Sequence, residues 1–213
     1  MNRINLVILA CIAVSLLYWF PGASNFIDEY LAFSGAHLLQ GKVWTVFTSL
    51  FLHADIVHLA GNMIFLFVFG NTLENELKAK KTLAAFFTGG IAAFLLGTFF
   101  YEPSTILIGA SAAIFTLTAV VMLVKPLKFS FIFLMPQGLV AIIYFAYNVL
   151  AVYTGEQSNI AYISHIIGFL TGVPFGAAWS KNLGKNLLIT AALFLIYLAV
   201  VVFIIPLITK ALV

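Results

Sequence analysis

Charged side chains are scarce in this sequence. Asp, Glu, Lys and Arg together make up 8% of the 213 residues, whereas a soluble domain carries about 25%. Hydrophobic residues make up 63%, and the mean hydropathy is +1.14. So few charges cannot cover a water-facing surface of ordinary polarity, and the composition therefore predicts a polytopic membrane protein.

Cysteine and the common cofactor motifs are also missing. The one cysteine, Cys11, lies in an apolar run, which excludes an intramolecular disulfide. The sequence has neither a P-loop nor a dinucleotide-binding fingerprint, and it lacks the Cys/His spacing of a zinc site. No basic stripe indicates a nucleic acid. We therefore expect no cofactor, no metal and no nucleic-acid partner.

Long apolar runs, by contrast, are abundant. A helix needs about 20 apolar residues to cross the hydrocarbon core of a bilayer. Seven stretches approach this length, at residues 4–20, 56–76, 80–100, 107–124, 129–152, 159–180 and 186–209. The first could be a signal peptide, but its run is long for one and no clear A-x-A cleavage site follows it. We expect an all-α fold made of these seven helices.

Residues 1–213 are expected to form a single membrane-embedded domain. Its parts are a first span at 4–20, a connection at 21–56, five core spans within 56–180 and a last span at 186–209. The connection is rich in aromatic residues, and these favour the interface between lipid and water. We therefore expect it to lie partly in the outer leaflet.

Lysine and arginine are distributed unevenly between the two sets of connections. If the N-terminus is cytoplasmic, the outside set contains only Lys42 and Lys210. The inside set is Arg3, Lys78, Lys80, Lys81, Lys125, Lys128, Lys181 and Lys185. Because short cytoplasmic connections carry the excess of positive charge, we expect a cytoplasmic N-terminus and an extracytoplasmic C-terminus. The expected location is the cell membrane.

Four polar side chains interrupt the second, fourth and sixth spans near one end. His58 and Asn62 fall in the first turns of the second span, Ser111 near the start of the fourth, and His165 one or two turns into the sixth. All three spans run from outside to inside, so the four side chains share one depth, about 10 Å below the outer boundary. We expect the three helices to be neighbours.

Each of these residues also has a purely structural interpretation. A serine among small residues usually permits close helix packing, and an asparagine can link two helices by hydrogen bonds. Histidine is harder to explain in this way, because ionisable groups inside a span are rare and tend to mark function. One face of the sixth span carries His165 together with Gly168, Gly172 and Gly176. If the helix that approaches this face carries Ser111, the two polar side chains can meet.

Three motifs lie in order on these spans. They are H-x-x-x-N on the second (His58, Asn62), G-x-S on the fourth (Gly109, Ser111) and H-x-x-G-x-x-x-G on the sixth (His165, Gly168, Gly172). Each motif is weak alone, but in this order the sequence resembles the rhomboid family of intramembrane serine proteases, from roughly Trp44 to Gly176. With its last span, it resembles the members that add one C-terminal helix to a six-helix core.

The resemblance implies roles for the polar residues. Ser111 is then the nucleophile and His165 the base of a catalytic dyad. The side chains of His58 and Asn62, with the backbone N–H of Ser111, form the oxyanion hole. No acid in the sequence obviously orients His165, so we expect a dyad without the third member of the familiar triad.

Supporting residues and departures from the family pattern follow from the same resemblance. The supporting glycines are Gly109, Gly168 and Gly172. Phe115 stands where an aromatic, more often tyrosine, stacks on the histidine. Ala112 replaces the glycine that usually follows the serine, and Thr45 replaces an arginine after Trp44. An alanine limits positive φ, so the turn around Ser111 must be one that alanine can adopt.

The partners implied are transmembrane protein substrates and the lipid bilayer. Substrates are expected to be single-pass proteins with a weak helix near the outer boundary. The sequence lacks H-E-x-x-H and a pair of aspartates on facing spans, which disfavours a metalloprotease or an aspartyl protease. Two other functions stay open: an inactive relative that binds transmembrane helices, and a transporter or channel lined by the polar layer.

Overall fold

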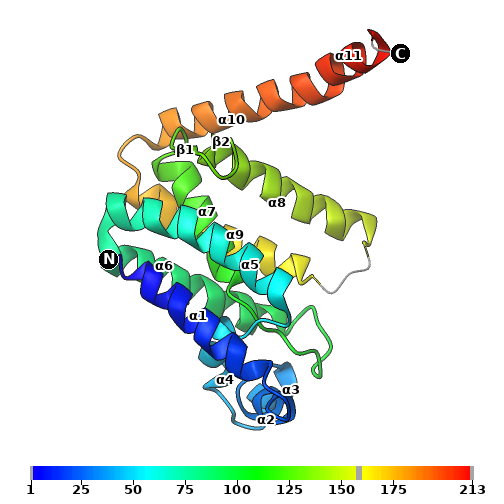
Figure 1. Cartoon of the computed structure of the whole chain (residues 1–213). Coiled ribbons are helices and arrows are strands. Elements are labelled where there is room, and N and C mark those ends of the chain that lie inside the picture. Colours follow the sequence, from blue (N-terminus) through cyan, green and yellow to red (C-terminus); the bar gives the residue numbers. More distant parts are fainter. Residues whose placement is uncertain (1, 157–159, 212–213) are drawn as a thin grey trace.

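Every predicted apolar stretch contains a helix in the computed structural model, which describes residues 2–156 and 160–211 (Figure 1). The main helices are α1 (Ile4–Tyr18), α5 (Ile56–Phe65), α6 (Asn71–Gly97), α7 (Ser111–Val124), α8 (Gln137–Thr154), α9 (Tyr162–Trp179), α10 (Leu183–Ala199) and α11 (Ile205–Ala211). Two π-helical segments continue them, η2 (Leu66–Gly70) after α5 and η3 (Val200–Ile204) after α10. Residue 159, at the start of the sixth predicted span, lies outside the described residues. The predicted all-α class is confirmed.

Three helices in the described part of the chain are long and apolar enough to cross a membrane. They run over Ile56–Gly97, Gln137–Thr154 and Leu183–Leu207. The helices α1 and α7 are apolar but shorter. These helices and the composition make the chain an integral membrane protein, while the division into seven spans stays a prediction.

The continuous stretch from Ile56 to Gly97 is divided at Lys78. The backbone of Lys78, with φ +70° and ψ +162°, is not helical. Before it, the carboxylate of Glu74 accepts the backbone N–H of Arg3 at 2.7 Å, next to the start of α1. After it, the second arm ends at Gly97, beside Leu107. The first arm begins with His58 near Gly109 and leads toward Arg3, whereas the second arm returns to Leu107. The two arms therefore run in opposite directions.

The connection between α1 and α5 folds into short helices. These are α2 (Ser24–Tyr30), α3 (Gly35–Leu39), α4 (Thr45–Thr48) and a 3₁₀ turn, η1 (Ser49–Phe51). Several of their large apolar side chains are exposed, including Phe26, Leu39, Trp44 and Phe47. Exposed aromatics on short helices suit a membrane interface. The placement of residues 21–56 in the outer leaflet stays a prediction.

The fourth predicted span begins too early. It was expected at 107, but α7 begins at Ser111. Leu107 instead forms an extended bridge with Phe33, and its backbone N–H donates to the Phe33 carbonyl at 2.8 Å. Gly109 has φ +115°, a conformation that no helix contains. Four apolar-looking residues therefore form a loop that leads into the helix.

The fifth predicted span also begins too early. It was expected at 129, but α8 begins at Gln137. Before it, β1 (Phe129–Ser130) and β2 (Met135–Pro136) pair as a short antiparallel hairpin. Proline has no backbone N–H and suits the residue just before a helix. A short apolar run does not by itself distinguish a hairpin from a helix, which explains the error.

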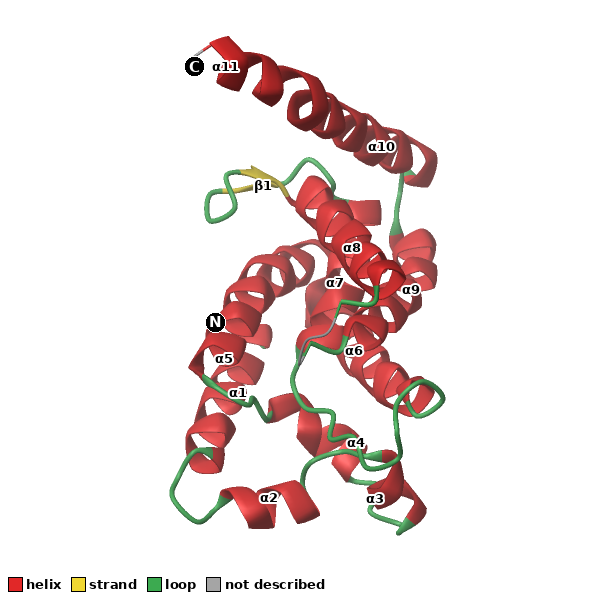
Figure 2. Cartoon of the chain, turned by 90° about the vertical axis from the view of Figure 1, so that its right-hand side faces the viewer, coloured by secondary structure: helices red, strands yellow, loops and turns green. Residues whose placement is uncertain are grey.

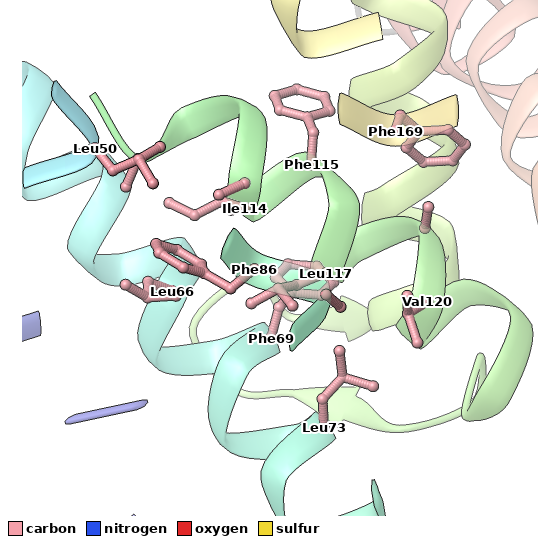
Figure 3. Close-up of a cluster of buried hydrophobic side chains, with 14 of the residues drawn as sticks. Leu50, Leu66, Phe69, Leu73, Phe86, Ile114, Phe115, Leu117, Val120 and Phe169 are labelled. Atoms are coloured by element: carbon pink, nitrogen blue, oxygen red, sulfur yellow. The ribbon is translucent and has the colours of Figure 1, made fainter. Parts of the chain in front are cut away.

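The helix α7 lies at the centre of the bundle, packed between α6, α8 and α9 (Figure 2). Its residues 112–123 are all buried, and none is charged. Figure 3 shows Ile114 and Leu117 of this helix near Leu66, Phe69 and Phe86 from the arms of the second and third spans. A helix that is apolar on every side is a core helix. The bundle therefore forms around α7.

The C-terminal helices α10 and α11 extend away from this bundle (Figures 1 and 2). Within their most apolar window, only 6% of the residues are buried. Asn186 Nδ2 attaches α10 to the bundle by donating to the carbonyl oxygens of Leu123 at 2.8 Å and Val124 at 3.2 Å. The last carbonyls of a helix lack partners within it. Asn186 thus caps the C-terminal end of α7.

Candidate active site

The first turn of α5 positions His58 and Asn62 on one helix face. Asp55 caps this helix, because its carboxylate accepts the backbone N–H of His58 at 2.8 Å. The two residues are four positions apart, so their side chains lie on the same face of the helix, about one turn apart. Asn62 is buried, and its Nδ2 donates to the His58 carbonyl oxygen at 3.0 Å.

Gly109 brings the loop before α7 up against these side chains. Its φ of +115° favours glycine. A Cβ at this position would lie 2.8 Å from His58 Nε2 and 3.9 Å from Asn62 Nδ2. The Gly109 N–H donates to the Ser49 carbonyl at 2.9 Å, which anchors the loop to the connection between α1 and α5. His58 and Asn62 therefore converge on a backbone site two residues before Ser111.

The glycine face of α9 packs directly on the backbone of α7. A Cβ on Gly168 would lie 2.9 Å from the carbonyl carbon of Ala112 and closer still to its oxygen. A Cβ on Gly172 would lie 2.8 Å from the Ala119 side chain. Thr116 Oγ1 donates across this contact to the Gly168 carbonyl at 2.7 Å. Small residues at such a contact let membrane helices approach closely.

This close approach brings Ser111 and His165 into hydrogen-bond contact. Ser111 is the first residue of α7, and its Oγ lies 2.8 Å from His165 Nε2. The ring of Phe115 stacks on the imidazole, with centroids 4.6 Å apart and planes 10° from parallel. His165 is 9% exposed, whereas Ser111 is half-buried. A hydroxyl paired with an imidazole in this way has the geometry of a nucleophile and its base.

A residue outside the predicted site contacts the other side of the imidazole. Asn148, on α8, has its Oδ1 2.8 Å from His165 Nδ1 and is only 3% exposed. An amide therefore lies beside His165 at the position where the predicted dyad has no third member. The only signal in the sequence was a polar residue near the outer end of an apolar span.

His53, in the connection between α1 and α5, contacts both α1 and the loop before Ser111. The backbone N–H of Ala110 points to its Nε2 at 3.5 Å, and its Nδ1 lies 3.0 Å from Ser15 Oγ. Because a backbone N–H only donates, Nε2 is the accepting nitrogen and Nδ1 carries the proton. Burial, with a smaller effect of nearby His58, lowers the pKa of His53 to about 3. The imidazole is therefore neutral at physiological pH.

Ala112 and Thr45 depart from the family pattern, and the backbone accommodates both residues. Ala112 has a helical conformation within α7 and is 1% exposed, so it requires no positive φ. The positive φ near the serine belongs to Gly109. Thr45 is fully buried, and its Oγ1 donates to the Lys42 carbonyl at 2.7 Å. Neither substitution introduces backbone strain.

Comparison with known proteins identifies the family. The rhomboid domain matches residues 40–182, which is well over half of the chain and includes all four residues of the polar layer. The chain belongs to the rhomboid family. Among the similar proteins are Rhomboid protease GluP of Bacillus subtilis (strain 168), 30% identical over 89% of this chain, and Rhomboid-like protease 1 of Toxoplasma gondii, 26% identical over 77%.

A third similar protein is Rhomboid-related protein 1 of Caenorhabditis elegans, 30% identical over 65% of this rhomboid. The matched regions cover only 56%, 40% and 38% of the Toxoplasma, Caenorhabditis and Bacillus proteins. The chain therefore spans about half or less of these relatives. They share the matched region with this rhomboid, and two of them are named as proteases.

Proposed function

We propose that this rhomboid is an intramembrane serine endopeptidase that acts through Ser111 and His165. The observation that carries the proposal is the 2.8 Å contact between Ser111 Oγ and His165 Nε2, made across the closely packed helices α7 and α9. Membership of a family that includes named proteases supports the same reading. The two residues come from distant parts of the sequence, so their meeting depends on the packing of α9 against α7.

The mechanism is acyl transfer. Ser111 Oγ attacks the carbonyl carbon of the scissile peptide bond while His165 Nε2 takes the hydroxyl proton. The resulting oxyanion is stabilised by the Ser111 backbone N–H, which lies at the N-terminus of α7, where backbone donors lack partners within the helix. His58 and Asn62 supply side-chain donors beside Gly109. His165 then gives its proton to the leaving amine, and water releases the acyl group from Ser111.

The substrates are single-pass transmembrane proteins that are cut near the extracytoplasmic boundary. A peptide bond inside a helix is covered and hydrogen-bonded, so the segment must unwind before Ser111 can reach its carbonyl. A transmembrane segment with weak helix propensity near that boundary unwinds most readily. The charge distribution of the connections favours a cell-membrane protein with a cytoplasmic N-terminus and an extracytoplasmic active site.

The second candidate is an inactive relative that binds transmembrane helices without cutting them. A binding protein has no need of the nucleophile, yet both Ser111 and His165 are present and in contact. A transporter is less favoured, because His58, Asn62, Ser111 and His165 gather near one end of their helices and the sequence shows no internal repeat.

The test is cleavage of a model transmembrane substrate in liposomes by the purified protein. Ser111→Ala and His165→Ala are expected to reduce product to background, and Asn62→Ala to lower kcat by about 10²–10³-fold, as is usual for one oxyanion donor. Ser104→Ala is the matched control, because Ser104 is an exposed serine in the loop that leads to α7. Equal cleavage by all variants would indicate a contaminating protease, and no cleavage of several substrates by the wild type would favour the binding function.

A further inference from the structure

The environment of His165 contains a third polar group whose role the Ser111–His165 pair does not explain. Asn148 Oδ1 lies 2.8 Å from His165 Nδ1, the nitrogen that faces away from Ser111. The asparagine belongs to α8, whereas Ser111 and His165 belong to α7 and α9. Its side chain is 3% exposed. A buried amide in an apolar helix is costly unless both its ends are hydrogen-bonded.

The orientation of this amide is determined by its second contact. Asn148 Nδ2 donates to the Tyr144 carbonyl oxygen, one turn earlier in α8, at 2.8 Å. A carbonyl oxygen only accepts, so the amide nitrogen must face Tyr144. The amide oxygen is left facing His165. Reversing the amide would place two acceptors together at Tyr144 and lose that hydrogen bond.

The oriented amide in turn determines the tautomer of His165. An amide oxygen cannot donate, so the 2.8 Å contact requires a proton on His165 Nδ1. A neutral imidazole then has a lone pair on Nε2, the nitrogen that lies 2.8 Å from Ser111 Oγ. In the opposite tautomer Nε2 would carry a proton, and it could not accept the proton of the serine.

We propose that Asn148 is the positioning residue of this site, which holds His165 in the Nδ1–H tautomer and thereby makes Nε2 the base toward Ser111. The proposal rests on the proposed function and makes the site a serine–histidine–asparagine arrangement. Asn148 contacts the nitrogen of His165 that faces away from Ser111, so it acts through the imidazole. Phe115 restrains the ring by stacking on its face, while Asn148 selects which nitrogen carries the proton.

Ser111, Asn148 and His165 come from three different helices, α7, α8 and α9. Ser111 and His165 are brought together by the contact of α7 with α9, and α8 is not needed for that contact. The tautomer, however, depends on α8 lying against α9 at Asn148. The nucleophile and base can therefore be in place while the base has the wrong tautomer, if α8 is displaced.

Two measurements test the proposal without a known substrate. The first is the rate at which a fluorophosphonate probe labels Ser111 in the detergent-solubilised protein. Asn148→Leu removes the acceptor and is expected to lower this rate about 10²-fold, which is typical of impaired general-base catalysis. Asn148→Asp restores an acceptor and is expected to recover labelling to within about tenfold of the wild type, because a carboxylate also accepts from Nδ1–H. Thr154→Val, also on α8 and exposed, should label like the wild type.

The second measurement is the ¹⁵N NMR spectrum of histidine-labelled protein, with the His165 signals assigned by their loss in His165→Gln. The wild type is expected to show His165 with its proton on Nδ1, and Asn148→Leu a mixture of the two tautomers. A purely structural role for Asn148 would lower stability without changing the tautomer. A wild-type spectrum with the proton on Nε2 overturns the proposal, even if Asn148→Leu fails to fold.

The outcomes separate this inference from the proposed function. Equal labelling of wild type and Asn148→Leu, with an unchanged tautomer, overturns the role of Asn148 and leaves the protease function standing. No labelling of the wild type, with the Nδ1–H tautomer present and lost in Asn148→Leu, contradicts the protease function and supports the assignment of the tautomer to Asn148.

Discussion

His53 is a buried imidazole whose charge state affects stability. Its pKa is about 3 in the folded protein, against 6.5 for an ordinary histidine, chiefly because of burial. Between these two values the unfolded chain binds more protons than the folded one, so stability falls as the pH falls from about 6.5 toward 3. Above about pH 6.5, His53 is neutral in both the folded and the unfolded protein, so its protonation no longer lowers the stability. We expect the Tm in detergent to decrease on acidification.

The matching variant is His53→Asn, which removes the titrating group. We expect its Tm to be lower than that of the wild type at pH 7.5, because the hydrogen bonds with Ser15 and Ala110 are disturbed. Between pH 6.5 and 4, the Tm of His53→Asn should decrease by fewer degrees than the Tm of the wild type. If the two proteins lose the same number of degrees over that interval, His53 does not contribute to the acid sensitivity.

Residue identities in the site were more predictable than residue contacts. The order of the motifs on the spans selected Ser111 and His165, and the structure brings them to 2.8 Å. Asn148 was not selected, because its contact with His165 depends on which face of α8 packs against α9. That face is a result of tertiary packing, and neither apolar periodicity nor spacing in one sequence determines it.

At the scale of helices, the contact between α7 and α9 determines the distance between Ser111 and His165. Gly168→Ala would place a methyl group against the carbonyl of Ala112. We expect this variant to separate the two helices, to abolish probe labelling of Ser111 and to lower the Tm. Both effects have one cause, since the backbone of α7 cannot yield as a flexible side chain can.

Gly61→Ala is the matched control for this substitution. Gly61 is also a glycine in a membrane helix, α5, but an added Cβ would meet nothing within 4 Å. Alanine is favoured over glycine inside a helix by about 0.5–1 kcal/mol. The control should therefore keep wild-type labelling. Unchanged labelling in Gly168→Ala would show that the close approach at Gly168 is not what sets the Ser111–His165 distance.

Helix boundaries were the least predictable part of the fold. The sequence predicted a helix at each long apolar run, because hydropathy reports the solvent that a segment is suited to. It did not predict the loop at 107–110 or the hairpin at 129–136, since both are apolar and short. The positive φ of Gly109 ends the loop before α7, and the pairing of Phe129 with Pro136 makes the hairpin before α8.

For the whole molecule, the length of α7 determines the depth of the site. A helix of 14 residues is about 21 Å long, whereas the hydrocarbon core is about 30 Å thick. Lys125 and Lys128 follow its C-terminal end and favour the polar boundary on that side. Ser111, at the other end, then lies about 10 Å below the opposite boundary. We therefore expect the side chains of His58, Asn62, Ser111 and His165 to lie inside the membrane, because the central helix is too short to cross it.

Which boundary lies above Ser111 is a property of the whole chain, since it depends on the charges of every connection. Eight basic residues in one set of connections against two in the other favour an extracytoplasmic site. The orientation can be measured with single cysteines, because replacing buried Cys11 by alanine leaves no thiol. Ser104→Cys then reports the end of the molecule near Ser111, and Lys128→Cys reports the other end. Both positions are exposed.

In right-side-out vesicles we expect a membrane-impermeant maleimide to label Ser104→Cys directly and Lys128→Cys only after the vesicles are permeabilised. Detergent should make both sites reactive, which controls for local protection of either thiol. The reverse pattern would place Ser111 below the cytoplasmic boundary. Substrates would then be cut at their cytoplasmic ends, and the proposed substrate class would have to change even if the Ser111–His165 chemistry were correct. The orientation therefore decides which end of a transmembrane substrate meets the site.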